Sequence, residues 1–383
     1  MKKKTISIIL VMIIMLINPV LSFAQVEITS KSALLMDFNT GKIIYSLNEN
    51  EKLPPASVTK IMTILLTMEA ISNGKLTMDD KVIVSEYAAG MGGTQIYLEA
   101  GETQRVEDLL RAVIIRSAND ASVALGEGIS GSNEAFVKLM NDRAKSLGMN
   151  NTHFSNPSGL PIDDHYTTAY DIALMSRELL KYSSITKYLT SYMEDLVVGK
   201  KKDSTQTMVN TNKLIKEYDG ITGLKTGSTS EAGYCISASA KRGDLQLIAV
   251  ILGGKTGAMR FTEAKKLLDY GFANYDSLNL GKKNDTISTI PIEKADSTSI
   301  ELVLERDSYA LISKENKGKV EKEIIYKEKI QSPVLKGDTL GELIYSVDGK
   351  EIDKVNLVAK NDVSSAGLLL LLKRTIISFI SGK

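Results

Sequence analysis

Hydrophobic and polar positions divide the chain into two parts with different periods. Up to about residue 275, apolar residues recur at helical spacing, and the segment 106–116 shows this with apolar residues at 106, 109, 110, 113 and 114. This spacing predicts six helices, over residues 57–73, 106–116, 121–130, 133–147, 168–181 and 260–273.

Strand patterns lie at both ends of this helical region. Two β-rich runs, GYCISASAK and LQLIAVIL, are joined by the turn Arg242-Gly243-Asp244 and follow the shorter run GLKTG. Near the start, SALLMDFNTGKIIYS predicts a hairpin across Asn39-Thr40-Gly41. We expect one antiparallel sheet with helices on both faces, an α/β sandwich, in a domain over residues 25–278.

From about Leu280, apolar and polar residues alternate instead. The alternating segments TISTIPIE, SIELVLE, YALISK, KVEKEIIYKEKI, ELIYSV and KVNLVAK are separated by Gly and Asp turns. Alternation with period two is typical of half-buried strands. The sequence therefore predicts a small, sandwich-like, all-β domain over residues 279–361, with no catalytic constellation of its own.

The N-terminus carries the pattern of a secretory signal. Lys2-Lys3-Lys4 precede the apolar run ISIILVMIIMLINPV and the small-residue site Ser22-Phe23-Ala24, which predicts a signal over residues 1–24, cleaved after Ala24. An uncleaved anchor is the alternative, but Asn18-Pro19 interrupts the run before the roughly 20 residues needed to span a membrane. The mature protein is expected to be extracytoplasmic.

The C-terminal segment AGLLLLLKRTIISFISGK predicts an amphipathic helix within residues 362–383. Apolar residues 368, 369, 372, 376, 379 and 380 gather on one arc, and Lys373, Arg374, Ser378 and Ser381 lie mostly on the other. Such a helix lies in a membrane surface. We expect it to bind the outer face of the cytoplasmic membrane, with a core helix of the last domain as the alternative.

Composition limits the partners. The chain has 47 basic and 46 acidic residues, and removal of the three leader lysines leaves 44 basic ones, so no basic face for nucleic acid is indicated. Cys235 is the only cysteine and is expected in a buried strand. His153 and His165 lack partners with metal-site spacing, so we predict neither a metal nor a cofactor.

Three short motifs occur in one order: Ser57-Val-Thr-Lys60, Ser117-Ala-Asn119 and Lys225-Thr226-Gly227. The first pattern also occurs as Ser72-Asn-Gly-Lys75 and Ser184-Ile-Thr-Lys187, and the third also as Lys255-Thr256-Gly257. Context favours the first copies. Ser57 precedes the helix-forming run VTKIMTILLTMEAIS, whereas Ser72 falls at the end of that helix, and Lys255-Thr256-Gly257 has the pattern of a turn before the next helix.

The first motif provides a nucleophile and a base. Ser57 is expected to open a buried helix, and Lys60, three residues on, then lies on the same face, with Cβ atoms about 5–6 Å apart. The positive end of the helix dipole and a second cation, Lys225, both disfavour a protonated Lys60. A neutral Lys60 can deprotonate Ser57.

The other two motifs complete a cleft. Ser117 and Asn119 are expected on a tight connection between helices, with Asp120 as the N-cap of the second helix, so their side chains can point into a site. The short predicted strand GLKTG carries Lys225, Thr226 and Gly227. Gly227 lets a peptide backbone approach this strand closely. Arg260 is a candidate second cation for a carboxylate.

In this order, the motifs resemble those of the active-site serine penicillin-binding proteins and β-lactamases. The segments ASVTKIMT, RSANDASVALGEGISGS, FSNPSGL, TAYDIALMSREL, LKTGSTSEAGYC and EAKKLLDYGF are similar to the low-molecular-mass penicillin-binding D-alanyl-D-alanine carboxypeptidases, over about residues 28–275. The resemblance implies a β-lactamase/transpeptidase-like fold. It also implies trimming of peptidoglycan stem peptides that end in D-Ala-D-Ala, with β-lactams as covalent inhibitors.

The resemblance also implies a role for each motif residue. Ser57 is the acylated nucleophile, Lys60 its base, Ser117 and Lys225 relay protons and stabilise charge, and Asn119 holds the substrate amide. The backbone N–H groups of Ser57 and Ser228 form the oxyanion hole, and Thr226 and Arg260 receive the terminal carboxylate. Ser228 stands where some relatives carry histidine, which affects substrate preference.

Three other functions are weighed against this one. A class A β-lactamase uses a glutamate-held water, but the segment NNTHFSNPSGLPIDDHYTTAYD has no glutamate, and Glu178 has the pattern of a surface helix residue. A β-lactam sensor is normally fused to a transmembrane signalling segment. A cell-wall interaction module would require the ordered motifs to be accidental. The carboxypeptidase is therefore the expected function.

Overall fold

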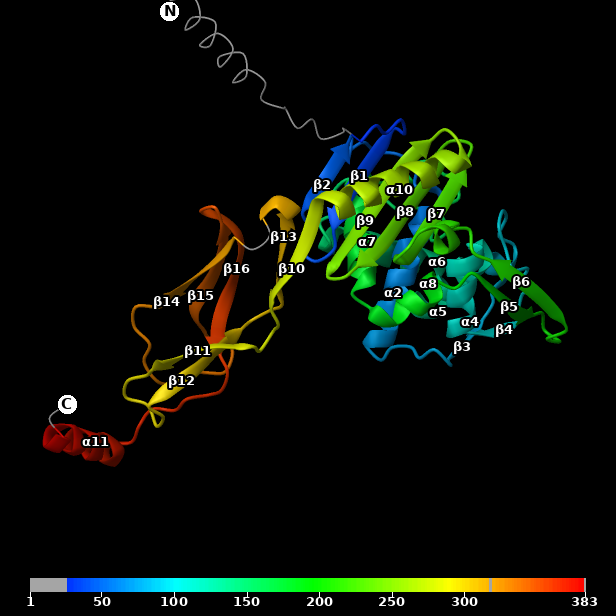
Figure 1. Ribbon diagram of the computed structural model, residues 1–383. Coiled ribbons are helices and arrows are strands. Elements are labelled where there is room, and N and C mark those ends of the chain that lie inside the picture. The colour runs from blue at the N-terminus through cyan, green and yellow to red at the C-terminus, as the bar shows by residue number, and fades with distance from the viewer. Residues whose placement is uncertain (1–25, 317–318, 382–383) are drawn as a thin grey trace, which may run out of the picture.

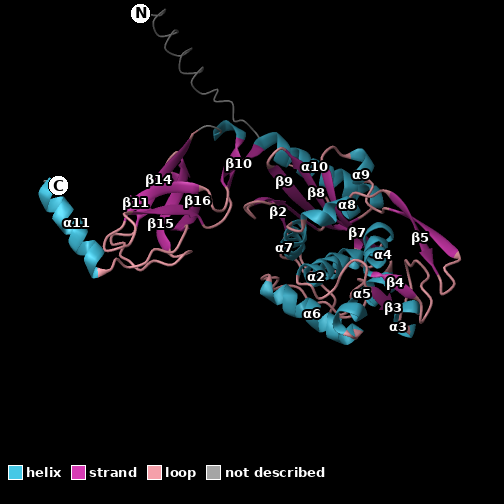
Figure 2. Cartoon of the chain, turned by 90° about the horizontal axis from the view of Figure 1, so that it is seen from below, coloured by secondary structure: helices cyan, strands magenta, loops and turns pink. Residues whose placement is uncertain are grey.

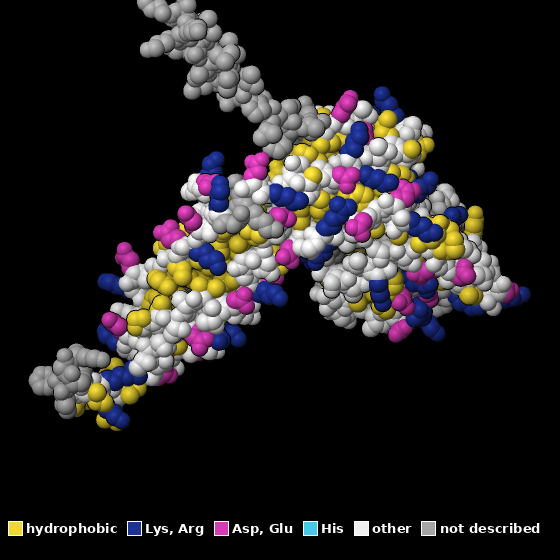
Figure 3. Space-filling model, in the orientation of Figure 1, with side chains coloured by type: hydrophobic (Ala, Val, Ile, Leu, Met, Phe, Trp, Pro, Cys, Tyr) yellow, Lys and Arg dark blue, Asp and Glu magenta, His cyan; other side chains and the backbone are white. Residues whose placement is uncertain are grey.

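The computed structural model describes residues 26–316 and 319–381; the expected signal segment lies outside these residues. The chain forms an α/β domain, then an all-β domain that extends away from it, and a helix at the far end (Figure 1). Both parts agree with the predicted fold class. Along the face in Figure 3, Lys and Arg side chains are interspersed with Asp and Glu side chains over both domains.

The first domain is built on a five-stranded antiparallel sheet in the order β2-β1-β9-β8-β7. The strands are β1 (Ser32–Asp37), β2 (Ile43–Leu47), β7 (Ile221–Thr229), β8 (Gly233–Arg242) and β9 (Leu245–Gly254). The predicted hairpin is confirmed, and Gly41 takes a positive φ of 73° at its turn. The hairpin joins the three later strands through the β1–β9 pair, as expected.

Helices cover both faces of this sheet because its strands are apolar on both sides. Leu34 and Met36 of β1 pack with the core that includes α2 and α7, whereas Ala33 and Leu35 face the core that includes α10. Figure 2 shows α10 on one side of the sheet and α2 and α7 on the other. The helices are α2 (Lys60–Ser72), α3 (Glu86–Ala89), α4 (Val106–Arg111), α5 (Asn119–Ser130), α6 (Asn133–Ser146), α7 (Ala169–Leu180), α8 (Thr186–Leu189), α9 (Leu214–Glu217) and α10 (Gly257–Asn274).

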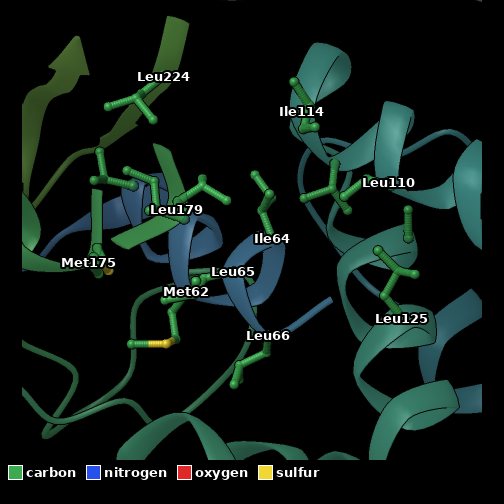
Figure 4. Packing of buried hydrophobic residues seen from close by; sticks show 14 of the residues in the cluster. Met62, Ile64, Leu65, Leu66, Leu110, Ile114, Leu125, Met175, Leu179 and Leu224 are labelled. Carbon is green, nitrogen blue, oxygen red and sulfur yellow. The ribbon is translucent and has the colours of Figure 1, made fainter. Parts of the chain in front are cut away.

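Helix α2 is the centre of the larger core. Ten of its thirteen residues are buried, since α2 runs between the sheet side and the helical side of the domain. Figure 4 shows Met62, Ile64, Leu65 and Leu66 of α2 among side chains from α4, η2, α5, α7 and β7. A helix that is apolar around most of its surface is held by packing on all sides.

Two small two-stranded sheets lie at the edge of the helical side and were not predicted. They are β3 (Lys81–Ile83) with β4 (Thr103–Arg105), and β5 (Met193–Val198) with β6 (Ser204–Val209). Among residues 26–316, the structure also has three short 3₁₀ turns, η1 (Ala56–Thr59), η3 (Ser183–Ile185) and η4 (Lys314–Asn316), and one π-helical turn, η2 (Ala112–Arg116). Both η1 and η2 adjoin predicted motif residues.

The second domain contains the alternating strands that the sequence predicts. A five-stranded antiparallel sheet has the order β11-β12-β16-β15-β14, while β10 pairs with β13 at the junction of the domains. The strands are β10 (Tyr275–Gly281), β11 (Thr286–Pro291), β12 (Ser299–Leu304), β13 (Ser308–Ser313), β14 (Val320–Tyr326), β15 (Thr339–Val347) and β16 (Lys350–Ala359). Helix α11 (Leu368–Ser381) follows and leaves Leu368, Leu369, Leu372, Ile376 and Ile377 exposed.

Candidate active site

The nucleophile candidate lies on a strained turn. Ser57 belongs to the 3₁₀ turn η1, so the expected helix start is a tighter turn that leads into α2 at Lys60. Ala56, just before it, has a positive φ of 49°, which is costly for a residue with a Cβ. The residues on either side, Ala56 and Val58, are buried, whereas Ser57 is partly exposed. The turn therefore leaves the Ser57 hydroxyl partly accessible between two buried neighbours.

Lys60 points its amine at that hydroxyl. Its Nζ lies 3.2 Å from Ser57 Oγ, and it donates hydrogen bonds to Asn119 Oδ1 at 2.7 Å and to the backbone oxygen of Ser158 at 2.5 Å. The side chain is fully buried. Burial first, and then the nearby Lys225, hold the pKa of Lys60 well below its ordinary value of 10.5. The arrangement favours a neutral amine next to Ser57.

The second motif follows a π-helical turn. Helix α4 continues into the π turn Ala112–Arg116, and Ser117 ends it in the left-handed conformation with φ 66°. The buried Ser117 Oγ has no hydrogen-bond partner among the described residues. Asn119 Oδ1 accepts from Lys60, and its Nδ2 donates to the backbone oxygen of Gly92 at 2.7 Å. Asn119 therefore contacts Lys60 directly, and Ser117 lies two residues before it, at the end of the π turn.

One expectation about this turn is wrong. Asp120 is not the N-cap of α5, because the helix begins at Asn119 with Ala118 in the cap position. The buried Asp120 carboxylate instead accepts from the backbone N–H groups of Ile96 at 3.2 Å and Leu98 at 3.1 Å. Burial is the largest influence on Asp120 and raises its pKa. The carboxylate fixes the loop that precedes β4.

The third motif lies on β7, next to η1. Lys225 is buried, and burial first, with Arg260 nearby, lowers the pKa of its amine to about 7. Its Nζ donates to the Thr226 backbone oxygen at 3.0 Å, and Thr226 Oγ1 donates to Thr211 Oγ1 at 2.7 Å. Two buried lysines of lowered pKa, Lys60 and Lys225, thus lie close enough to interact electrostatically, next to residues 55–59, which carry Ser57 and are named here the nucleophile turn.

Gly227 allows the strand to approach this turn. A Cβ at Gly227 would lie 2.7 Å from Ser57 N, 2.9 Å from Val58 N and 3.0 Å from Pro55 O. Ser228, the next residue, is exposed at the same edge. The close contact that requires glycine is therefore with the backbone of the nucleophile turn itself, in addition to the substrate approach that the sequence suggests.

Arg260, on α10, donates hydrogen bonds to the backbone of β7 and β8. Its Nη1 donates to the backbone oxygen of Gly227 at 2.8 Å and to that of Cys235 at 3.3 Å. The guanidinium lies 5.5 Å from the centroid of the Tyr234 ring. Arg260 therefore brings a positive charge to the strand that carries Lys225.

The competing copies of the motifs have other structural roles. Ser72 is the last residue of α2, Ser184 lies in the 3₁₀ turn η3, and Thr256 caps α10 by accepting from Met259 N. Glu178 forms an ion pair with Arg143 at 3.0 Å. These placements agree with the interpretation drawn from context.

Sequence reasoning missed three contributors to the site. Ser158 and Gly159 lie in the segment FSNPSGL, and Thr211 precedes α9; only that first segment carried a signal, as part of a family resemblance. Gly159 has φ +79°, and a Cβ there would lie 1.9 Å from Ala56 O. Only glycine can stand so close to the nucleophile turn.

A serine hydroxyl and a buried lysine of lowered pKa at the start of a buried helix, next to a serine–asparagine turn and a strand that carries a second lysine, define the class of active-site serine acyl-transfer proteins. Within this class, the family model for D-alanyl-D-alanine carboxypeptidase matches residues 20–256, and the model for the C-terminal domain of penicillin-binding protein 5 matches residues 275–365. The chain belongs to the D-alanyl-D-alanine carboxypeptidase family, serine peptidases that act on peptidoglycan.

Individual relatives agree with this assignment. The chain is 47% identical to D-alanyl-D-alanine carboxypeptidase DacF of Bacillus subtilis over 348 residues, which cover 91% of this chain and 89% of the relative. It is 34% identical to DacA of Haemophilus influenzae, with 89% and 87% covered. The predicted family and enzyme class are confirmed.

Solved structures show the same architecture. Penicillin-binding protein 5 from Haemophilus influenzae superposes with a TM-score of 0.78 at 33% identity, covering 88% of this chain and 98% of that one. A penicillin-binding protein from Listeria monocytogenes, in its ampicillin-bound form, superposes with a TM-score of 0.54 at 32% identity, covering 64% and 98%. The predicted fold class is confirmed.

Proposed function

We propose that Ser57 is acylated by the D-Ala-D-Ala end of peptidoglycan stem peptides. The observation that carries this proposal is the hydrogen bonding of Lys60. Burial and the nearby Lys225 lower the pKa of Lys60 and so favour its neutral amine, which has two hydrogens and one lone pair. Asn119 Oδ1 and the Ser158 carbonyl can only accept, so they use both hydrogens and leave the lone pair facing Ser57 Oγ at 3.2 Å. Lys60 is then the base that takes the hydroxyl proton.

The acylation step follows from this geometry. Ser57 Oγ bonds to the carbonyl carbon of the penultimate D-alanine as its proton passes to Lys60. The backbone N–H groups of Ser57 and Ser228 receive the oxyanion. The C–N bond then breaks, and the proton reaches the leaving amine through the unpartnered hydroxyl of Ser117, while Lys225 stabilises the charge. Free D-alanine leaves, and water hydrolyses the ester.

The substrate is held on both sides of this centre. Thr226 and Arg260 receive the terminal carboxylate, which requires the Thr226 hydroxyl to turn from its present acceptor, Thr211, towards the substrate. Asn119 holds the substrate amide with the second hydrogen of its Nδ2, since the first is donated to Gly92. Gly227 lets the peptide lie against β7.

β-Lactams are proposed to acylate the same hydroxyl and to remain there. A class A β-lactamase is the competing function, and it releases the acyl group with a glutamate-bound water. Glu178 is engaged with Arg143 at 3.0 Å on α7. Residues 150–171 contain no glutamate. The penicilloyl adduct is therefore expected to persist for minutes or longer.

The direct test measures release of D-alanine from a tripeptide ending in D-Ala-D-Ala, beside labelling by a fluorescent penicillin. Ser57→Ala is expected to lose both, whereas Ser72→Ala and Ser184→Ala keep both. Intact-mass spectrometry after a penicillin pulse then follows the adduct. Penicillin labelling that survives in Ser57→Ala would contradict the assignment of Ser57 as the nucleophile. Rapid loss of the penicilloyl adduct with little D-alanine released would identify a β-lactamase.

We also propose that the enzyme works outside the cytoplasm, at the membrane surface. Within residues 26–316 and 319–381, no helix is long and apolar enough to cross a membrane. Exposed apolar side chains on α11, with Leu369 84% exposed, support a helix that lies in the lipid surface. Residues 25–278 would then be the catalytic unit, and residues 279–361 would set its height above α11.

A further inference from the structure

A loop behind the nucleophile turn, residues 153–166, connects α6 to α7 and is named here the strap. His153 and Tyr166 exchange two backbone hydrogen bonds at its base, at 2.9 and 3.1 Å. Inside it, Asn156 Oδ1 accepts from Ser158 N at 3.1 Å and Gly159 N at 2.6 Å. The strap is therefore a tightly cross-linked loop rather than an open connection.

The strap contacts the nucleophile turn at three points. The Ser158 carbonyl accepts a hydrogen bond from Lys60 Nζ. Gly159 lies so close to the carbonyl oxygen of Ala56 that a Cβ at residue 159 would be 1.9 Å from it. The third contact is polar and buried: His165 Nε2 lies 2.8 Å from Thr59 Oγ1. The first two contacts involve atoms next to the chemistry. The third joins two side chains for which the proposed reaction has no use.

The protons in this third contact can be assigned by counting donors. Thr59 has one hydroxyl hydrogen, and it is donated to the Ala56 carbonyl at 2.8 Å. Thr59 Oγ1 must therefore accept from His165 Nε2. His165 Nδ1 accepts from the backbone N–H of Ser155 at 3.0 Å. This pattern requires a neutral imidazole with its hydrogen on Nε2.

The environment of His165 agrees with that state. The side chain is only 7% exposed, and Phe154 packs against its ring. Burial, followed by the nearby His153 and Lys60, lowers the pKa of His165 to about 4. Protonation would place a hydrogen on Nδ1 against the Ser155 N–H group. The chain of bonds from Ser155 to Ala56 is thus intact at neutral pH.

This series of hydrogen bonds ends at Ala56, which has the least favourable backbone conformation of the turn. The Ala56 carbonyl is held in place by Thr59 while Ala56 keeps its φ of 49°. The peptide group of that carbonyl also contains the N–H of Ser57, which is one of the two proposed oxyanion donors. A rotation of this peptide would therefore displace both the hydroxyl-bearing residue and its oxyanion donor.

We propose that His165 is a positioning residue for acylation, acting through Thr59 to hold the Ala56–Ser57 peptide in its reactive orientation. This inference rests on the proposed acylation of Ser57. It adds a side chain that touches neither substrate nor nucleophile. His165 fixes the hydroxyl of Thr59, Thr59 fixes the Ala56 carbonyl, and the strained turn then keeps its donor aimed at the reacting carbonyl.

The kinetic test compares Thr59→Val with Thr59→Ser, because only the valine lacks the hydroxyl. The acylation rate constant of a fluorescent penicillin is measured separately from its non-covalent binding. We expect Thr59→Val and His165→Phe to slow acylation by about tenfold or more, as a small misplacement of reacting groups does. Thr59→Ser should stay within about threefold of the wild type, and the Thr59→Val/His165→Phe double variant should be no slower than its slower parent.

Tyr218→Phe is the matched control. Tyr218 packs in the core that includes α10, and the variant removes a hydroxyl that donates to the exposed Asp269 at 2.7 Å, so it tests for a general effect of losing a partly buried hydrogen bond. We expect its acylation to be unchanged. Equal rates for Thr59→Val and Thr59→Ser, additive effects in the double variant, or the same loss in Tyr218→Phe would each overturn the proposal.

A spectroscopic test reads the His165 ring in the wild-type protein. The chain has two histidines, so ¹⁵N-histidine labelling gives two sets of ring signals, and the set that is lost in His153→Gln belongs to His153. We expect a neutral ring with its hydrogen on Nε2 from pH 8 to pH 5. A hydrogen on Nδ1, or a charged ring at pH 7, would overturn the proposal. Penicillin labelling of Ser57→Ala, by contrast, would refute the proposed nucleophile and leave the hydrogen-bond assignment of His165 intact.

Discussion

Gly227→Ala should damage the active site through the backbone alone. The added Cβ would meet Ser57 N at 2.7 Å, Val58 N at 2.9 Å and Pro55 O at 3.0 Å. All three atoms belong to the backbone of the nucleophile turn, so no side chain can rotate to make room. Either β7 or the turn must therefore move.

The size of that movement sets the expected loss. Ordinary Cβ contacts begin near 3.4 Å, so the strand and turn must separate by about 0.7 Å. A misplacement of about 1 Å at a reacting centre costs about 100-fold in rate. We therefore expect acylation of Ser57 to fall by roughly 30- to 100-fold, or about 2–3 kcal/mol of transition-state stabilisation. Overpacking also costs about 1–3 kcal/mol of folding stability.

The assay is the second-order rate of labelling by a fluorescent penicillin, with thermal unfolding measured on the same samples. Gly367→Ala is the control, since a Cβ at Gly367 meets nothing within 4 Å. It should acylate at the wild-type rate. If Gly227→Ala acylates within threefold of the wild type while remaining folded, the close packing of β7 on η1 does not position the nucleophile.

Three further outcomes follow from the charges and the ends of the molecule. Lys60→Arg keeps its proton, so it should slow penicillin acylation by orders of magnitude while the protein stays folded. An acylation rate near that of the wild type would contradict the role of Lys60 as the base. Lys225 has a pKa of about 7 when folded and 10.5 as its ordinary value. Between pH 7 and 10.5 the unfolded chain then binds more protons at Lys225 than the folded protein does. The free energy of unfolding of the wild type, relative to that of Lys225→Met, should therefore rise with pH across this window. A difference in thermal unfolding that does not change with pH would contradict the lowered pKa of Lys225. A chain ending at Asp362 should remain active but no longer sediment with anionic vesicles, and continued sedimentation would contradict the role of α11.

The strands and motif positions could be predicted because local patterns specify them. Alternation and turn residues located the hairpin of β1 and β2 and the strands of the second domain. The order of the serine, asparagine and lysine motifs predicted a cleft, and the structure brings Lys60 to 2.7 Å from Asn119, although 59 residues separate them. Sequence spacing indicated which residue types belong together.

Other features are imposed by tertiary packing, which a local pattern does not record. Asp120 looks like a helix cap because its neighbours favour a helix start, yet its carboxylate is used by Ile96 and Leu98 from a distant loop. The hairpin of β5 and β6 was missed because its alternation is short and its outer positions are exposed. The strap contributes a carbonyl, Ser158 O, and a backbone acceptor can be supplied by any residue type.

The two unfavourable backbone positions of the site explain why so much structure surrounds it. Ala56 and Ser117 both take positive φ, at 49° and 66°, and each is adjacent to a proposed catalytic group or is one. Such conformations persist only where neighbours overdetermine them. Gly159 and Thr59 hold the Ala56 carbonyl, while the π-helical turn before Ser117 sets its direction. The same packing buries Lys60, so the constraints that place the hydroxyl also lower the pKa of its proposed base.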